Sequence, residues 1–272
     1  MTLANAASHD LGHAVQGWDR AGVEAAPGHP PGVILICEHA SNRLVAPWLS
    51  VSPATTASHA ASDIGALGLA QALGAELAPG QGGAELIHAP LSRVIYDLNR
   101  SPDRDDACPV QSEIHPITMN VGLSRAARLD RVEQIYLPFH DLVRARIARA
   151  LALGRRPVIL TIHSFSPVWH GVARSVEFGV IHDAMPALAR QIAASAAGSG
   201  LSTALNEPYS AADHVTHTLR LHALPYGLDN AMLEIRNDLI ATPEGQVSMA
   251  ARLAPILQEA IAQVSERPCL AS

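Results

Sequence analysis

Lysine is absent from the chain, so all 19 basic residues are arginine. This absence excludes a Schiff-base or pyridoxal phosphate lysine and the lysine of a phosphate-binding loop. The three cysteines, Cys37, Cys108 and Cys269, lie far apart and form no CxxC pair, which excludes a thiolate zinc site and favours a reducing compartment. No apolar run approaches the roughly 18 residues of a membrane-spanning helix.

Positive charge is also scarce relative to negative charge. The formal net charge is −6, which argues against a surface that binds nucleic acid. The 272 residues are 48% hydrophobic and 16% charged, which predicts one globular domain over 1–272 with a loosely ordered arm at 1–30. Residues 1–10 lack the basic start and apolar core of a secretory signal. We therefore predict a cytoplasmic protein without a membrane partner.

Short apolar runs alternate with amphipathic stretches along the chain. The predicted strands are 33–37, 85–88, 93–96, 158–162, 176–181 and 231–235, with one further possible strand in the arm. The predicted helices are 62–77, 124–153, 185–197, 211–221 and 244–264, the second of them kinked or divided by Pro138 and the first capped by Ser62. Residues 101–121 read as a long functional loop. The alternation predicts an α/β fold whose sheet is mainly parallel or mixed and has helices on both faces.

Polar residues follow or end three of the apolar strands. His39 and His163 follow the first and fourth of the predicted strands, and Glu234 lies near the end of the last. Ligands of open α/β sheets bind beyond the carboxyl ends of the strands, so these side chains are expected to converge on one cleft. Two histidines and a carboxylate suit Zn²⁺ with one position left for water, and a further glutamate can take that water's proton. Histidines hydrogen-bonded within the core remain the alternative.

Five sequence blocks occur in an order typical of one known family. They are Cys37-Glu38-His39-Ala40-Ser41-Asn42, Asp63-Ile64-Gly65-Ala66, Ser92-Arg93-Val94-Ile95-Tyr96-Asp97-Leu98-Asn99-Arg100, Asn206-Glu207-Pro208-Tyr209-Ser210 and Glu234-Ile235-Arg236-Asn237-Asp238-Leu239. With these blocks the chain resembles the N-formylglutamate amidohydrolase family from about residue 33 to residue 240. That family is similar in fold to the zinc carboxypeptidases, with a phosphorylase/hydrolase-like α/β core.

The resemblance implies one zinc ion held by His39, Asp63 and His163. The HxxE ligand pair of the carboxypeptidases is missing, because Asn42 stands at the third position after His39. Asp63 is chosen as the carboxylate ligand because it resembles the acidic ligand of related amidases. Glu38 is the alternative, although alternation along a strand would point it away from His39.

The resemblance also implies roles in catalysis and substrate binding. Glu234 would be the general base, and Arg93 would polarise the scissile carbonyl. The residues expected to bind substrate are Asn99 and Arg100, which would grip a carboxylate, Arg174 and Arg236, which would serve a second carboxylate, and Tyr209, which would donate a hydrogen bond.

The implied reaction is hydrolysis of N-formyl-L-glutamate, or a similar N-acyl acidic amino acid, to formate and L-glutamate. A zinc-activated water would attack the amide, in a step of histidine degradation. The expected partner is this small N-acyl amino acid. Another zinc-dependent N-acyl amino acid or peptide amidase and a non-catalytic metabolite-binding protein remain alternatives. A serine hydrolase using Ser41 or Ser164 is disfavoured because GxSxG is absent.

Overall fold

The computed structural model describes residues 22–25, 31–78 and 83–265. Most of the predicted arm at 1–30 and Cys269 lie outside these residues, whereas the possible strand in the arm is present as β1 (Gly22–Ala25). In the described part, no helix is long and apolar enough to cross a membrane.

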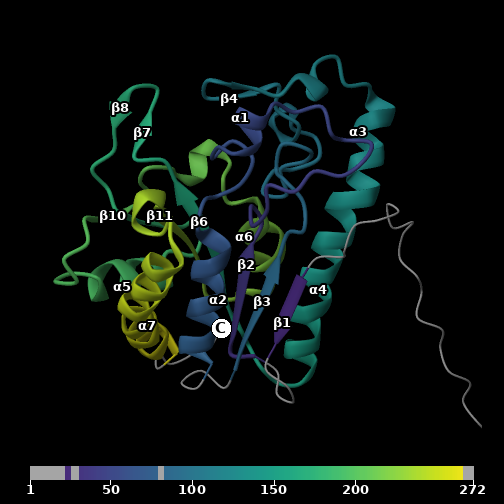
Figure 1. The fold of residues 1–272 in the computed structure, drawn as a ribbon. Coiled ribbons are helices and arrows are strands. Elements are labelled where there is room, and N and C mark those ends of the chain that lie inside the picture. Colours follow the sequence, from purple (N-terminus) through teal and green to yellow (C-terminus); the bar gives the residue numbers. More distant parts are fainter. Residues whose placement is uncertain (1–21, 26–30, 79–82, 266–272) are drawn as a thin grey trace, which may run out of the picture.

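One mixed sheet of seven strands forms the centre of the molecule (Figure 1). Its spatial order is β1, β3 (Ala84–His88), β2 (Val33–Cys37), β6 (Val158–Phe165), β11 (Asn230–Arg236), β9 (Phe178–Ile181) and β10 (Thr203–Leu205). The four strands β3, β2, β6 and β11 are parallel to one another, while β1 and β9 run antiparallel to their neighbours β3 and β11, and β10 is parallel to β9. The predicted α/β fold with a mixed sheet is confirmed.

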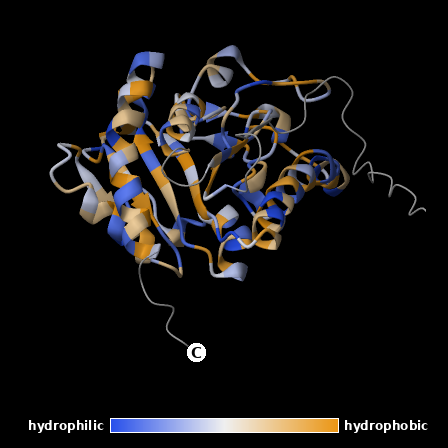
Figure 2. Ribbon diagram, turned by 90° about the horizontal axis from the view of Figure 1, so that it is seen from below, coloured by the Kyte–Doolittle hydropathy of each residue, from blue (hydrophilic) through white to orange (hydrophobic). Residues whose placement is uncertain are grey.

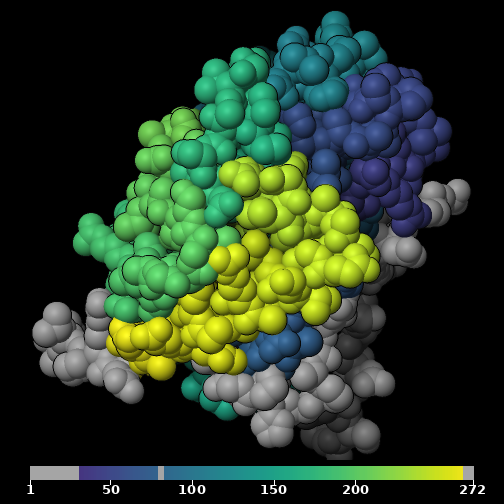
Figure 3. All heavy atoms as spheres, turned by 60° about the vertical axis from the view of Figure 1, so that its left-hand side comes forward, coloured from purple at the N-terminus to yellow at the C-terminus, as the bar shows by residue number. Residues whose placement is uncertain are grey.

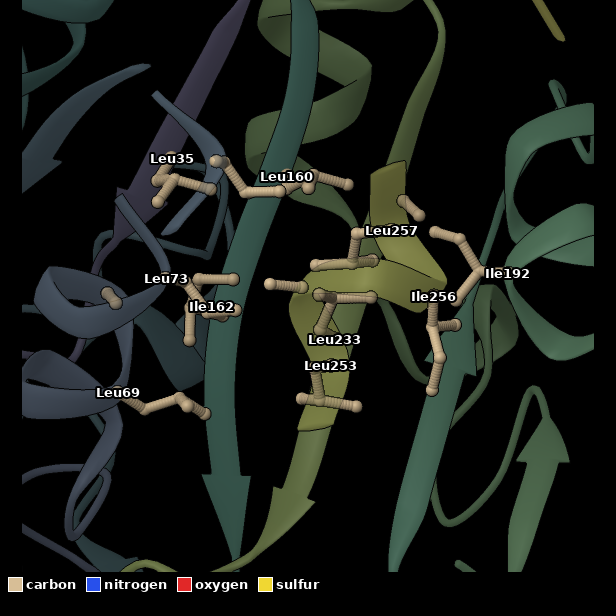
Figure 4. Packing of buried hydrophobic residues seen from close by; sticks show 14 of the residues in the cluster. Leu35, Leu69, Leu73, Leu160, Ile162, Ile192, Leu233, Leu253, Ile256 and Leu257 are labelled. Atoms are coloured by element: carbon tan, nitrogen blue, oxygen red, sulfur yellow. The ribbon is translucent and has the colours of Figure 1, made fainter. Parts of the chain in front are cut away.

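Helices α2 (Ala66–Leu77), α5 (Ala187–Ser195) and α7 (Pro243–Ser265) pack on one face of the sheet. Figure 4 shows Leu73 of α2 and Leu257 of α7 pointing towards Leu160 and Leu233 of the strands. All four of these side chains are fully buried. Removing each from water contributes about 1.5–3 kcal/mol. Helix α7 forms the outer surface of this face (Figure 3).

The opposite face is covered by one long helical segment and by α6 (His217–His222). The long segment consists of α3 (Arg125–Arg131), the π-helix η3 (Val132–Tyr136) and α4 (Leu137–Ala152). Phe139, Val143 and Ile147 project from α4 at helical spacing into the core. Figure 2 shows both hydrophobic and hydrophilic residues along the helices, as one-sided burial requires.

Shorter elements gather at the end of the molecule where the parallel strands finish (Figure 1). They are α1 (Pro53–Thr56), the hairpin of β4 (Gln111–Ser112) and β5 (His115–Pro116), and the hairpin of β7 (Val168–Trp169) and β8 (Val172–Ala173). The remaining 3-10 turns are η1 (Asp105–Ala107), η2 (Thr118–Asn120), η4 (Ala211–Asp213), η5 (Leu224–Tyr226) and η6 (Asn237–Leu239). The loop predicted at 101–121 therefore contains two 3-10 turns and the β4–β5 hairpin.

The predicted strand at 93–96 is wrong, because this segment forms a turn. The amide of Ile95 donates to the carbonyl of Ser92 at 3.1 Å, and the Ser92 hydroxyl donates to the carbonyl of Ala61 at 2.7 Å. Val94 and Ile95 are buried, so the segment has the apolar composition of a strand although its backbone groups pair outside the sheet. Composition alone does not separate these two cases.

The helix predicted from residue 62 begins instead at Ala66, and Gly65 occupies its N-cap position with φ +80°. Ser62 therefore does not cap this helix. Any Cβ at Gly65 would overlap the carbonyl oxygen of Ile240, which explains the glycine there. The late start leaves Asp63 in the loop before the helix, free to turn into the site described below.

Two other predicted helices differ in detail. The segment 124–153 is helical without a break from Arg125 to Ala152, but it changes to a π-helix at 132–136, directly before the turn that contains Pro138. The single helix predicted at 211–221 is wrong: η4 ends at Asp213, the next residue, His214, has a φ of +57°, and α6 starts only at His217. A left-handed residue cannot continue a right-handed helix.

Candidate metal centre and active site

A cavity of about 560 Å³ opens at the carboxyl ends of β2, β6 and β11. The polar side chains that line it are His39, His59, Asp63, Arg93, Asp97, Asn99, Arg100, Asp106, Gln111, Ser112, Glu113, His163, Ser164, Ser166, Arg174, Tyr209, Asp213 and Glu234. Segments from most of the chain therefore converge on one site. The cavity lies where the strand rule for open α/β sheets places a ligand site.

His39, Asp63 and His163 meet at the floor of this cavity and are all buried. The Asp63 Oδ2 atom lies 3.2 Å from Nδ1 of His39 and 2.9 Å from Nδ1 of His163, and the two Nδ1 atoms are 3.3 Å apart. The backbone helps to hold Asp63 in place, because its amide donates to the carbonyl of His39 at 2.9 Å and the Ser164 amide approaches its Oδ2 at 3.3 Å.

The triangle formed by these three atoms fits a tetrahedral metal ion. Ligands about 2.0–2.1 Å from a tetrahedral zinc lie roughly 3.3 Å from one another. The observed separations of 2.9, 3.2 and 3.3 Å match this edge length. The described residues thus include a buried His/Asp/His group that could bind a metal ion, built from the three residues predicted as ligands.

A carboxylate faces the outer nitrogen of each histidine. Asp97 Oδ1 lies 2.8 Å from Nε2 of His39, and Glu38 Oε2 lies 3.2 Å from Nε2 of His163. Such carboxylates orient metal-binding imidazoles and raise their basicity. Glu38, the alternative metal ligand of the sequence analysis, is therefore on the far side of His163 from the three-atom cluster.

Proton accounting favours a cation at this point. A neutral imidazole carries one N–H, yet each of these rings has a carboxylate beside both of its nitrogens. Four buried carboxyl groups lie in and beside the cluster, those of Glu38, Asp63, Asp97 and Glu234. One guanidinium, that of Arg93, pairs with two of them, Asp63 and Asp97. A divalent ion between the Nδ1 atoms and Asp63 would offset much of this negative charge.

The pKa shifts have the same origin. Burial works against protonation of both rings, but the carboxylates dominate and raise the pKa of His39 and, more strongly, of His163. Burial would raise the pKa of Asp63, but the two histidines and Arg93 hold it well below its ordinary value. Asp63 is therefore ionised at neutral pH, as a metal ligand must be.

Arg93 lies between two of these carboxylates. Its NH1 approaches Asp63 Oδ1 at 3.2 Å, and its NH2 approaches Asp97 Oδ2 at 2.6 Å. Asp63 consequently presents one oxygen to Arg93 and the other to the histidines. Arg93 also lines the cavity, which is where its predicted role on a carbonyl would require it.

Glu234 lies across the cavity floor on β11. Its Cα pairs with that of His163 on β6 and with that of Gly179 on β9, so the three form one row across the sheet. Glu234 is buried, and its Oε2 has no hydrogen-bond partner among the described residues. Burial, together with the nearby charge of Asp63, raises the pKa of Glu234 to about 7. A carboxyl group with such a pKa can accept and release a proton near neutral pH.

The predicted substrate residues Asn99 and Arg100 line the cavity but are already engaged. The Asn99 side-chain amide donates to the Val215 carbonyl and accepts from the Thr218 amide at 3.1 Å. Arg100 pairs through Nε with Asp106 at 3.1 Å and donates from NH1 to backbone carbonyls. Both residues tie the 97–106 loop to neighbouring segments, and their contact with substrate stays a prediction.

Arg174 lines the cavity and is surrounded by aromatic rings. Its guanidinium lies 5.0–5.5 Å from the ring centres of Phe165, Trp169 and Tyr209, and its NH1 donates to the Tyr209 hydroxyl at 3.1 Å. Within the described ranges it forms no ion pair with a carboxylate. The aromatic faces hold it by cation–π attraction while leaving its charge unneutralised.

Arg236 is not brought together with the other predicted residues. It pairs with Asp238 at 2.8 Å and with Glu177 at 3.4 Å, and it does not belong to the lining of the described cavity. Its position near the end of β11 resembled that of Glu234 in the sequence, but its ion pairs hold it away from the cavity.

Several cavity residues were missed by the sequence analysis as members of the site. Asp97, His59, Glu113 and Trp169 all line the cavity. A signal was available for Asp97, which lies four residues after Arg93 in a quoted block. No such signal existed for Trp169, which reaches the cavity only because β6 continues into the β7–β8 hairpin.

Comparisons with known proteins identify the family of the chain. The profile of the N-formylglutamate amidohydrolase family matches residues 32–241. The crystal structure of a gene product from Agrobacterium tumefaciens is 43% identical with a TM-score of 0.84, over 91% of this chain and 96% of that one.

The crystal structure of N-formylglutamate amidohydrolase from Ralstonia eutropha JMP134 is 18% identical, with a TM-score of 0.63, over 90% of this chain and 98% of that one. It shares the fold. No match was found among curated proteins. The chain belongs to the N-formylglutamate amidohydrolase family.

Proposed function

We propose that the protein hydrolyses N-formyl-L-glutamate, or a closely similar N-acyl acidic amino acid, to formate and the free amino acid. The observation that carries this proposal is the three-atom cluster of His39, Asp63 and His163 with Glu234 in the same row of the sheet. Family membership supports the reaction class. Release of glutamate from a formylated precursor would fit a step of histidine degradation.

His39, Asp63 and His163 would hold one zinc ion through two imidazole nitrogens and one carboxylate oxygen, a donor set that zinc accepts. When bound, zinc supplies a Lewis acid that lowers the pKa of water and polarises a carbonyl group. Asp97 and Glu38 would keep both rings oriented and basic through their outer nitrogens. The net negative charge of the site supports a divalent cation.

Glu234 would move the proton. Its Oε2 has no described partner and belongs to a buried carboxyl group whose pKa is about 7. It would accept a proton from the attacking water and then pass it to the departing amine nitrogen. General acid–base catalysis of this kind contributes typically about 10²–10⁴-fold in rate.

Arg174 would anchor a carboxylate of the substrate. A guanidinium can bind a carboxylate with two parallel hydrogen bonds, and this one has no competing acid among the described residues. Arg93 would stay beside Asp63 and Asp97 and stabilise negative charge that develops on the carbonyl oxygen. A cavity of about 560 Å³ suits a ligand of amino-acid size.

The test is formate release from N-formyl-L-glutamate by wild-type protein, before and after chelation and with zinc added back. Glu234→Gln should keep its zinc and lose about 10²–10⁴-fold in kcat. Glu76→Gln, on an exposed turn of α2, is the matched control and should behave as wild type. Retained zinc and no hydrolysis of any N-acyl amino acid would contradict an enzymatic role and support a metabolite-binding protein instead. Release of another acyl group with no formate would keep the reaction class and change the substrate.

A further inference from the structure

A second group of metal-binding side chains lies at the rim of the cavity. It consists of His59, on the loop after α1, Glu113, in the turn of the β4–β5 hairpin, and His115, on β5. One ligand atom of each residue lies within 4.8 Å of one from each of the others. The two imidazole rings are 5.3 Å apart at their centres. All three residues are half-buried, and the function proposed above does not use them.

The contact between His59 and Glu113 is close but is not a hydrogen bond. His59 Nε2 lies 3.1 Å from Glu113 Oε2. The same nitrogen is shielded from solvent and has no partner in hydrogen-bond geometry among the described residues. The distance again matches the roughly 3.3 Å edge of a tetrahedral zinc site.

Glu113 is held so that one of its oxygens faces His59. Its other oxygen, Oε1, accepts a hydrogen bond from the backbone amide of His170 at 2.7 Å. This bond joins the tips of the β4–β5 and β7–β8 hairpins. A carboxylate with one oxygen fixed by a neighbouring donor is oriented to give the other to a metal ion.

We propose that His59, Glu113 and His115 bind a second divalent ion of the zinc type at the mouth of the cavity. Two imidazole nitrogens and one carboxylate select ions such as Zn²⁺ or Co²⁺ over Mg²⁺ and Ca²⁺, which prefer oxygen donors. The ion links the loop after α1 to the β4–β5 hairpin, and Trp169 packs 5.8 Å from the His59 ring at the same rim. The site is weaker than the buried one, because its ligands are partly solvated. It does not depend on the reaction proposed above.

The test is the number of Zn²⁺ ions bound per chain by untagged protein in equilibrium dialysis, followed by elemental analysis. Wild type should bind one ion tightly and a second more weakly. His115→Gln and His59→Gln should each keep the tight ion and raise the Kd of the second by more than about tenfold. His170→Asn is the matched control, since it removes an exposed histidine from the same rim, keeps the backbone amide, and should bind two ions.

Absorption of bound Co²⁺ gives an independent readout. The second equivalent of Co²⁺ should add a band in wild type and His170→Asn that is missing from both rim variants. A single bound ion in wild type overturns the proposal, as does a second ion that both rim variants retain with wild-type Kd. Circular dichroism verifies the fold of each variant, and the two rim variants lie on different segments, so misfolding of one leaves the other to decide.

Discussion

Substitution of Asp97 tests whether the carboxylates around the buried cluster contribute to metal binding, and it leaves the three proposed metal ligands unchanged. Its Oδ1 lies 2.8 Å from Nε2 of His39 and accepts a hydrogen bond from the backbone amide of Asn99 at 2.9 Å. Its Oδ2 lies 2.6 Å from NH2 of Arg93. Burial opposes its charge, but Arg93 and His39 hold the pKa of Asp97 well below the ordinary value. Asp97→Asn therefore removes a full negative charge at neutral pH while keeping the shape of the side chain.

The expected effect is a loss of zinc affinity. Carboxylates that orient a metal-binding histidine are typically worth about 10–100-fold in metal affinity, or roughly 1.4–2.7 kcal/mol. Asn can still accept a hydrogen bond from His39 or donate one to the backbone, but it cannot raise the basicity of the imidazole. It also leaves Arg93 with Asp63 as its remaining carboxylate partner, which draws Asp63 away from the ion. We expect the upper half of this range.

The assay is competition for zinc between the protein and a chromophoric chelator of known affinity. Asp105→Asn is the matched control, because the Asp105 side chain is solvated and its ion pair with Arg128 is long, at 3.6 Å. The control should keep the wild-type Kd. An unchanged Kd in folded Asp97→Asn would refute the reasoning, since the outer contact of His39 would then have no part in binding the ion.

Three further outcomes follow from the structure. Arg174→Met should raise the KM for N-formyl-L-glutamate about 10–100-fold, because a charged hydrogen bond to the substrate is lost. Arg236→Met, which lies outside the cavity, should leave KM unchanged. Equal KM values in the two variants would exclude Arg174 as the anchor. Burial lowers the pKa of His222 to about 4, whereas an unfolded histidine has a pKa of about 6.5. As the pH falls below about 6.5, the unfolded chain therefore binds a proton that the folded chain does not bind. The free energy of unfolding should decrease by about 1.3 kcal/mol between pH 7.5 and pH 5.5 for this reason. Urea unfolding at both pH values should show a smaller loss in His222→Gln, and equal losses would contradict this assignment. Gly65→Ala should lower the free energy of unfolding by more than the roughly 1–2 kcal/mol that left-handed backbone costs alanine, because its Cβ also meets a backbone carbonyl; Gly154→Ala, left-handed with open space around it, should show the backbone cost alone.

The central strands were predictable because their burial is complete. The run 33–37 was predicted to the residue, and 158–162 and 231–235 were predicted within three residues at either end. Strands that are covered on both faces need continuous runs of apolar residues, and such runs can be recognised from the local sequence alone. The wrong strand at 93–96 shows the limit of that signal, since a buried turn needs the same residues.

The three cluster residues were also predictable, for a different reason. His39 follows β2 by two residues, His163 lies near the end of β6, and parallel strands bring their carboxyl ends together. Asp63 was identified only through the family resemblance, because nothing local distinguishes a ligand from a helix cap. Its true position outside α2 depends on Gly65, whose left-handed backbone delays the helix.

Contacts between segments far apart in the chain determined the rest. The sequence by itself determined the buried strands, the absence of lysine chemistry and the polar residues at the strand ends, since each depends on local composition or on spacing along one strand. Only the tertiary structure decided that Asp97 and Glu38 face the outer nitrogens of the histidines, that Arg236 is held by Asp238 away from the cavity, and that Arg174 keeps a free charge. These outcomes depend on which side chains from distant segments come into contact. The order of residues along the chain does not contain the distances between such side chains in space.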